Sequence, residues 1–215
     1  ELVYGCEAVL DGNWAGRQWT AAFEAELAKV CGVRYAVMVN SGSSANLLAL
    51  AALTAGEHAD ASASSDYGVV TAAAGFPTTV NPIVQLGMVP VFVDVELGTY
   101  VVNRGQADDA VRSGARAVMA AHTLGNVADL FYTDTPVVED MCDALGSLDR
   151  DGIHVGKHAG LSTLSFYPAH HITSLDASEL VFLQDPQGVK SWQPIGPFVD
   201  AGQWQDWKCV SFDKD

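Results

Sequence analysis

Basic side chains are scarce in this 215-residue sequence, which holds 11 lysine and arginine residues against 26 aspartate and glutamate residues. The formal net charge is −15, whereas a protein that binds nucleic acid needs a basic face. Nucleic acid is therefore excluded as an expected partner. An anionic small ligand would need a local pocket of amide donors, because the general field of the protein repels it.

Long hydrophobic runs and paired cysteines are also missing. No apolar stretch approaches the roughly 18 residues that a bilayer-spanning helix needs, so no membrane association is expected. The opening residues ELVYGCEAVLDG are neither basic nor continuously apolar and do not resemble a signal peptide. The cysteines are far apart, lack a CxxC pair and favour a reducing cytoplasm over a disulfide framework; they are Cys6, Cys31, Cys142 and Cys209.

What the sequence does contain is an alternation of strand and helix patterns. A helical pattern over residues 1–31 is clearest at 19–30, and the absence of a starting cap indicates an incomplete N-terminus. The expected strands are 35–39, 69–72, 89–93, 116–120, 136–138, 161–166 and 180–183. Helices are expected after residue 46, from Gly75 to Gln85, over 106–113 and over 185–192. This order predicts an α/β fold of three layers, α/β/α, with a mostly parallel sheet and right-handed crossovers.

The domain boundaries follow from the same patterns. Residues 1–192 are expected to form one large cofactor-binding domain. Residues 193–215 are rich in proline, glycine and tryptophan and show no period. We expect them to be a tail that leads toward a C-terminal small domain missing from this sequence.

A small polar turn, Asn40 to Asn46, joins the strand at 35–39 to a strong helix-forming run. Strand, turn and helix in this order aim free backbone N–H groups and a helix dipole at an anion. Ser43 and Ser44 would add hydroxyl donors. A plain serine cap, which any helix start favours, explains the same residues, and the turn lacks the Walker and GxGxxG patterns.

Three further features stand at expected strand ends: Phe76, Asp140 and the pair His170-His171. Ligands of open α/β sheets bind at this edge. An anion site, an aromatic plate, a carboxylate and a base together match the needs of a pyridoxal-type cofactor. Each also has an ordinary explanation: Asp140 as a capping or sheet-edge acid, and the histidines as loop residues with one ring packed and one in water.

Five stretches carry a family resemblance: VNSGSSANLLAL (39–50), AAGFPTTVNPIVQLGMVPVFVDV (73–95), AHTLGN (121–126), VVEDMCDALGS (137–147) and STLSFYPAHHIT (162–173). In these the chain resembles the sugar-aminotransferase-like family of pyridoxal-phosphate fold type I enzymes. Within that family it is most similar to the CDP-4-keto-6-deoxyglucose 3-dehydratases, iron–sulfur enzymes of 3,6-dideoxyhexose synthesis. The likeness runs through most of residues 1–173.

The resemblance assigns roles to the residues of these motifs. Gly42, Ser43 and Ser165 would hold the phosphate, Phe76 would stack on the ring, and Asp140 would pair with the pyridinium nitrogen. Aminotransferases of the family carry their Schiff-base lysine where His170 stands, and the nearest lysine here, Lys157, lies 13 positions away. The cofactor is therefore expected to be noncovalent pyridoxamine 5'-phosphate, related to pyridoxal 5'-phosphate. His170 would be the base that removes a proton from its aminomethyl carbon, and His171 would give structural support.

The resemblance also raises an iron–sulfur cluster, which needs four ligands. Cys142 matches the family's first cysteine, two residues after the pyridinium aspartate. The family's other three cysteines form a later C-x-C-x7-C run, which is not intact here: only Cys209 lies in that region. SLDASEL replaces the glycine-rich segment that normally follows HHIT. A [2Fe–2S] cluster with Cys142 and Cys209 among its ligands stays one hypothesis, and Cys142 as a small buried hydrophobe is the other.

The resemblance implies a lyase that dehydrates a nucleotide-linked 4-keto-6-deoxyhexose at C3, of the CDP-4-keto-6-deoxyglucose type, in O-antigen synthesis. A homodimer and a flavin or iron–sulfur reductase are the expected protein partners. Two alternatives remain open. One is a cluster-free dehydratase of the GDP-4-keto-6-deoxymannose kind, which also uses histidine for lysine. The other is a noncatalytic scaffold subunit of the same fold, since fold alone does not establish function.

Overall fold

The computed structural model describes residues 2–10, 12, 17–55, 66–130, 135–157, 159–172 and 179–183. The α-helices within them are α1 (Leu2–Leu10), α2 (Arg17–Cys31), α3 (Gly42–Ala55), α4 (Pro77–Gln85) and α5 (Arg104–Arg112), with a 3-10 turn at Thr123–Gly125. The strands are β1 (Tyr35–Val39), β2 (Gly68–Ala72), β3 (Val89–Val93), β4 (Ala117–Ala121), β5 (Val137–Asp140), β6 (Leu161–Ser165) and β7 (Glu179–Leu183).

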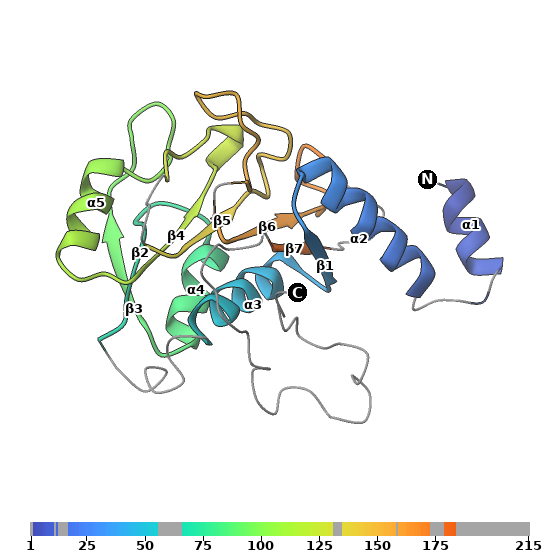
Figure 1. Ribbon diagram of the computed structural model, residues 1–215, viewed down its shortest axis with the longest axis horizontal. Coiled ribbons are helices and arrows are strands. Elements are labelled where there is room, and N and C mark those ends of the chain that lie inside the picture. Colours follow the sequence, from blue (N-terminus) through green and yellow to red (C-terminus); the bar gives the residue numbers. More distant parts are fainter. Residues whose placement is uncertain are drawn as a thin grey trace, which may run out of the picture.

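All seven strands form one sheet in the order β1-β7-β6-β5-β4-β2-β3 (Figure 1). The five strands β6, β5, β4, β2 and β3 are parallel to one another. β7 is antiparallel to both of its neighbours, β1 and β6. The predicted mostly parallel sheet is confirmed. Its parallel strands end at one common edge, here called the carboxyl edge, which includes Asp140 and Ser165.

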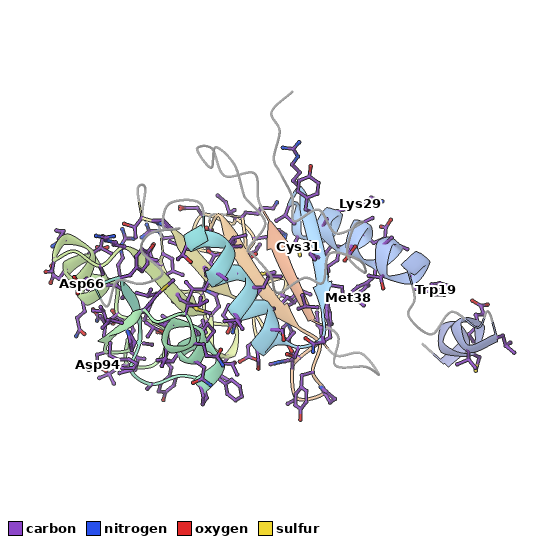
Figure 2. All side chains as sticks on the ribbon, turned by 90° about the horizontal axis from the view of Figure 1, so that it is seen from below. Trp19, Lys29, Cys31, Met38, Asp66 and Asp94 are labelled. Carbon is purple, nitrogen blue, oxygen red and sulfur yellow. The ribbon has the colours of Figure 1, made fainter. Side chains whose placement is uncertain are left out.

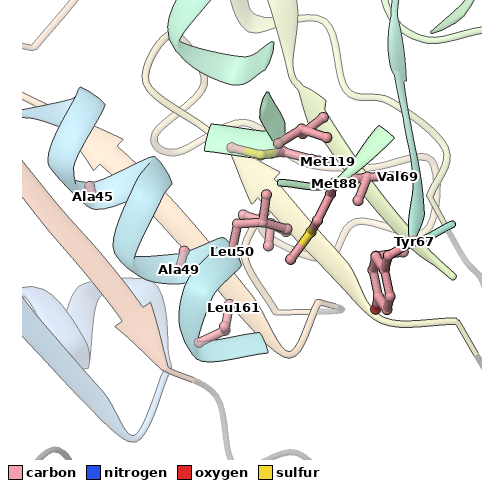
Figure 3. Packing of buried hydrophobic residues seen from close by; sticks show 11 residues of the cluster. Ala45, Ala49, Leu50, Tyr67, Val69, Met88, Met119 and Leu161 are labelled. Atoms are coloured by element: carbon pink, nitrogen blue, oxygen red, sulfur yellow. The ribbon is translucent and has the colours of Figure 1, made fainter. Parts of the chain in front are cut away.

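The two faces of the sheet are covered by different helices. On one, the α3 face, Leu50 of α3 packs with Val69 and Met119 (Figure 3). Ile83 of α4 belongs to the same cluster. On the other, the α5 face, Ala107 of α5 packs with Val70 and Val118. Side chains alternate along a strand, so neighbouring valines of β2 serve opposite faces. This arrangement confirms the three-layer fold.

α2 completes the α5 face at the β1 end of the sheet. Leu27 and Cys31 of α2 pack with Leu164 of β6. Figure 2 shows Trp19 and Cys31 at the two ends of α2, with Cys31 beside the sheet. α1 is set apart from the main body in Figure 1.

Two helices begin earlier than the sequence pattern predicted. α3 starts at Gly42, so the expected polar turn is the first turn of the helix itself. α5 starts at Arg104, because the side chain of Asn103 accepts a hydrogen bond from the N–H of Gln106 and caps the helix. The expected strands were correct to within two residues at each end.

Some predicted features lie outside the described residues, namely the helix at 185–192 and the tail from residue 193, which includes Cys209. The division into a large domain and a tail therefore stays a prediction. Within the described ranges, none of the helices combines the length and apolar character that crossing a membrane requires.

Candidate functional site

Asp140 is the last residue of β5 and its carboxylate is buried on the α3 face, 7% exposed. Its Oδ2 accepts hydrogen bonds from Nδ2 of Asn46 at 2.9 Å and from Oγ1 of Thr79 at 3.1 Å. Its Oδ1 accepts one from the backbone N–H of Cys142 at 3.2 Å. Burial of a carboxylate is costly unless donors surround it, so the carboxyl edge contains a site built around this group.

The start of α3 lies at the same edge. Ser41 precedes the helix, and its Oγ accepts the N–H of Ser44 at 3.1 Å. The expected alternative, a serine cap, is therefore present. The N–H groups of Gly42 and Ser43 have no partner among the residues that the structure describes. A capped helix start with two unpaired N–H groups is able to bind an anion.

Ser165 is connected to this helix start through β6. Oγ1 of Thr163 donates to Oδ1 of Asn46 at 2.6 Å, which fixes α3 against β6. Ser165 is two residues beyond Thr163 and faces the same side of the sheet. Gly42 is one helical turn before Asn46 and likewise lies nearer the carboxyl edge. The structure thus places the predicted phosphate-binding residues at one edge, with Ser165 itself buried.

Phe76 precedes α4 in an extended conformation, with Pro77 at the first helical position. Its carbonyl accepts the N–H of Thr79, the residue that also bonds Asp140. The ring of Phe76 is 71% exposed. An exposed aromatic ring near the carboxyl end of β2 is suited to stacking on a bound ring.

His170 follows β6 and is held by a carboxylate. Its Nδ1 lies 2.8 Å from Oδ1 of Asp143, three residues beyond Asp140 in the turn after β5. The carboxylate accepts the Nδ1 proton, so in the neutral ring Nε2 carries the lone pair and is the basic atom. His170 keeps 22% of its side chain exposed. This arrangement leaves a partly exposed imidazole whose Nε2 can accept a proton, as the predicted role of His170 requires.

His171 points into the same turn. Its Nε2 lies 3.1 Å from the carbonyl oxygen of Leu145, which only accepts, so Nε2 of His171 is the donor. The two adjacent histidines thus hold the segment after β6 against the turn after β5. This contact agrees with the structural support predicted for His171.

The acidic pair at the end of β5 is divided between the faces of the sheet. Glu139 points to the α5 face, where its Oε2 accepts the N–H of Gly156 at 2.7 Å. His122 lies on that face too, with Nδ1 accepting the N–H of Ala128 and Nε2 at 3.9 Å from Oε1 of Glu139. Both are buried. They support the sheet behind the site and do not line it.

Cys142 lies beside Asp140 and is half-buried. No group of three or more metal-ligating side chains is found within the described ranges, and Cys209 lies outside them. Binding of an iron–sulfur cluster by Cys142 and Cys209 therefore stays a prediction. A cluster that needs four ligands would draw on residues beyond those described.

Sequence analysis missed four residues of this network: Asn46, Thr79, Thr163 and Asp143. Asn46 carried a signal, because it is an isolated polar residue at the start of the otherwise apolar run ANLLALAAL. The others gave none, since threonine is common in strands and helix starts, and an acid in a turn is ordinary.

The residues fit a pyridoxal-type phosphate ester. The unpaired N–H groups at the start of α3 suit a phosphate, and the buried Asp140 carboxylate suits a ring N–H. Gly42, Ser43 and Ser165 would hold the phosphate, Phe76 would contact the ring face, and Asp140 would hold the ring nitrogen.

Comparison with known proteins identifies the family of this chain. The profile of the DegT/DnrJ/EryC1/StrS aminotransferase family matches residues 2–193. A dTDP-4-dehydro-2,6-dideoxy-D-glucose 3-dehydratase of Saccharopolyspora spinosa is 50% identical over 175 residues, which is 78% of this chain and 38% of the relative. The lipopolysaccharide biosynthesis protein RfbH of Salmonella typhimurium is 44% identical over 180 residues, which is 80% of this chain and 41% of the relative.

A solved structure shares the fold. The Escherichia coli GDP-4-keto-6-deoxy-D-mannose-3-dehydratase with bound hydrated PLP superposes with a TM-score of 0.73 at 26% identity, covering 85% of this chain and 48% of that one. The chain thus spans less than half the length of the relatives it matches. With a family profile over most of its residues, this chain belongs to the DegT/DnrJ/EryC1/StrS aminotransferase family.

Proposed function

We propose that the protein containing this chain dehydrates a nucleotide-linked 4-keto-6-deoxyhexose at C3, using noncovalent pyridoxamine phosphate. The observation that carries the proposal is the His170–Asp143 pair. His170 stands where the resemblance gives aminotransferases a lysine, and its contact with Asp143 leaves Nε2 able to accept a proton. Relatives named as 3-dehydratases of dTDP- and GDP-linked sugars support the reaction class.

The lysines of this chain support noncovalent binding. Of the two in the described ranges, Lys29 pairs with Glu26 on the exposed side of α2. Lys157 lies against Gly32, at the end of α2. Neither belongs to the site around Asp140, so in the described chain no amine is placed to form a covalent link to a cofactor there.

Pyridoxamine phosphate, when bound, supplies an amine that condenses with a sugar ketone and a ring that delocalises an electron pair. Gly42, Ser43 and Ser165 bind the phosphate, and Asp140 orients the ring nitrogen. His170 takes up a proton at Nε2 while Asp143 holds Nδ1 and stabilises the imidazolium that results. The same His170 would return that proton to a departing hydroxyl, since part of its side chain is exposed.

Finer features of the proposal rest on the resemblance. These are a substrate of the CDP-4-keto-6-deoxyglucose type, a [2Fe–2S] cluster with Cys142 and Cys209 among its ligands, a reductase partner, a homodimer and a cytoplasmic location. The cluster-free dehydratase of the GDP-4-keto-6-deoxymannose kind stays the alternative, since a solved enzyme of that name shares the fold. The two versions differ in whether visible iron–sulfur absorption accompanies the activity.

The test uses the full-length protein, purified without oxygen and supplied with pyridoxamine phosphate. CDP-, dTDP- and GDP-linked 4-keto-6-deoxyhexoses are offered separately, and loss of water from the sugar is followed by mass spectrometry. We expect turnover of at least one, a cofactor absorption band, and visible absorption only if the cluster is present. Binding of the cofactor without dehydration of any of the three sugars would contradict the proposal.

Two histidine variants sharpen this test. His170→Asn should lower kcat on the order of a hundredfold or more, as expected for loss of a general base, without abolishing cofactor binding. His154→Asn is the matched control, since His154 is an exposed histidine between β5 and β6. Equal activity of both variants would exclude His170 as the base. If the wild type does not bind the cofactor, the dehydratase proposal fails and the noncatalytic scaffold subunit remains as the alternative.

A further inference from the structure

Asn46 joins four elements through its side-chain amide. From α3, its Nδ2 donates to the Asp140 carboxylate at the end of β5 and to the carbonyl oxygen of Thr78 in α4, at 3.2 Å. Its Oδ1 accepts the hydroxyl of Thr163 in β6 at 2.6 Å. Asn46 and Thr163 are 1% and 0% exposed. The amide therefore has partners on both its nitrogen and its oxygen in a site without water access.

The orientation of this amide is determined by its partners. The Thr78 carbonyl and the Asp140 carboxylate both require a donor, so the atom facing them is the nitrogen. The hydroxyl of Thr163 then donates to the amide oxygen. A rotated amide would direct its oxygen at two acceptors, which is repulsive. Asn46 consequently has one arrangement, and Thr163 helps to fix it.

The hydrogen bonds leave the two oxygens of Asp140 unequal. A carboxylate oxygen has about two acceptor positions. On Oδ2 both are taken, by Asn46 and Thr79, whereas Oδ1 receives the N–H of Cys142 alone within the described part of the chain. One acceptor position therefore remains, and it is on Oδ1.

We propose that Asn46 is a positioning residue: it holds Oδ2 of Asp140, with Thr79, so that Oδ1 is the atom that receives the ring N–H of the cofactor. Thr163 orients Asn46 for this role. The inference rests on the proposed function of Asp140 as the partner of the ring nitrogen. The inference adds that Oδ1 is the oxygen of Asp140 that receives the ring N–H. It also adds that residues without direct contact to the cofactor orient the Asp140 carboxylate.

The test follows the ring nitrogen directly in full-length protein. Pyridoxamine phosphate labelled with 15N in the ring is bound, and the 15N chemical shift reports whether that nitrogen is protonated. We expect Asn46→Leu to move the shift toward the unprotonated value and to weaken cofactor binding about tenfold, the effect of one lost charged hydrogen bond. Thr163→Val should move both readouts in the same direction by less.

The control is Thr54→Val, at a buried threonine of α3 whose hydroxyl, among the described residues, bonds the carbonyls of Leu50 and Ala51 and no group of the site. It should leave the 15N shift unchanged even if it lowers stability. Thr163→Val differs from the wild type by one hydroxyl and carries the test if Asn46→Leu does not fold. If Asn46→Leu folds and its bound cofactor keeps the 15N chemical shift seen with the wild type, the inference is overturned. If only Thr163→Val folds, an unchanged 15N shift in that variant overturns it.

Asp140→Asn separates this inference from the proposed function. If Asp140→Asn moves the shift and the Asn46 and Thr163 variants do not, the inference on Asn46 fails and the function stands. If Asp140→Asn leaves the shift unchanged, or the wild type does not bind pyridoxamine phosphate, both fail together.

Discussion

Two neighbouring residues of β6 differ in what their hydroxyl groups contact. Thr163 faces α3 and donates to Asn46. Ser162 faces the opposite side, is 1% exposed, and its Oγ has no hydrogen-bond partner among the described residues. A buried hydroxyl without a partner costs free energy, whereas a paired one contributes to stability.

The two residues should therefore respond oppositely to removal of the hydroxyl. Ser162→Ala should leave the free energy of unfolding unchanged or raise it by up to about 1 kcal/mol. Thr163→Val should lower it by about 2 kcal/mol, because the oxygen of Asn46 loses its donor. Urea denaturation of both variants measures the difference. A larger loss for Ser162→Ala than for Thr163→Val would contradict the assigned contacts.

Asp143 contacts His170, the base of the proposed function, so variants of Asp143 should separate chemistry from cofactor binding. Asp143→Ala removes the acceptor for Nδ1 of His170 and should lower kcat on the order of tenfold or more. Asp143→Asn keeps an oxygen that can accept the same proton and should retain more activity. Steady-state kinetics and pyridoxamine phosphate titration of each variant test this. A parallel loss of cofactor affinity would instead indicate a role in binding.

The cysteines should differ in reactivity toward alkylating reagents. Burial raises the pKa of the Cys31 thiol to about 11, against a smaller opposing effect of Lys157. The thiolate is the reactive form, so Cys31 should be alkylated last, well after the exposed Cys6. Timed iodoacetamide labelling followed by peptide mass spectrometry gives the order. Labelling of Cys31 before Cys6 in folded protein would contradict the packing of α2.

At the scale of single residues, the sequence identified the site residues that stand in a recognisable motif. It did not identify the residues whose role comes from a contact with a distant part of the chain. Asp140 and His170 could be named because they follow recognisable strands. Asn46 and Asp143 are selected by partners far away in the chain, which only the fold brings together. Their roles depend on tertiary contacts, which local patterns do not encode.

Among the elements, α2 is attached to β1 by a carboxylate. Oε1 of Glu24 accepts the backbone N–H of Met38 at 2.7 Å. Desolvation raises the pKa of Glu24 above its ordinary value of 4.5, and the hydrogen bond from Met38 opposes this in part. The folded state thus binds this proton more readily than the unfolded state does, so the contribution of Glu24 to stability is greatest at low pH.

This contribution should be lost as the pH rises through 4.5 and then through the higher pKa of the folded protein. Glu24→Gln keeps an oxygen for Met38 and removes the titration. The variant should therefore gain stability relative to the wild type between about pH 4 and pH 7. Urea denaturation across that range measures the gap. Glu26→Gln, an exposed position on the same helix, controls for the change in charge; an equal trend there would contradict the assignment.

Element boundaries were predictable where the pattern was strong. The strands are short apolar runs between glycine, proline and polar residues, and these signals located all of them. The start of α3 was placed too late, because glycine and serine are poor helix formers, and the cap at Ser41 and the contacts of Asn46 outweigh that preference. The cap at Asn103 likewise decided the start of α5.

At the scale of the whole molecule, the residues of the candidate site come from several loops and helices, and the sheet brings these segments together. Ligand binding should therefore stabilise the folded protein as a unit. Pyridoxamine phosphate at about 100 times its dissociation constant should add about 2.7 kcal/mol to the free energy of unfolding. Calorimetry of the full-length wild type with and without cofactor should show it. The same cofactor concentration should stabilise Asp140→Asn less; equal stabilisation would argue against Asp140 as a ligand.

The order of strands has a consequence for how this chain acquires its structure. β1 is made early, yet it contacts the rest of the sheet through β7, which comes from the far end of the described residues (Figure 1). Until β7 inserts between β1 and β6, the edge of each of these two strands that will face β7 has no hydrogen-bonding partner. Pairing over such a long sequence separation is slow, because a large loop must close first. On the ribosome, completion of the sheet therefore has to await synthesis of residues 179–183, and until then the exposed edges are open to wrong partners.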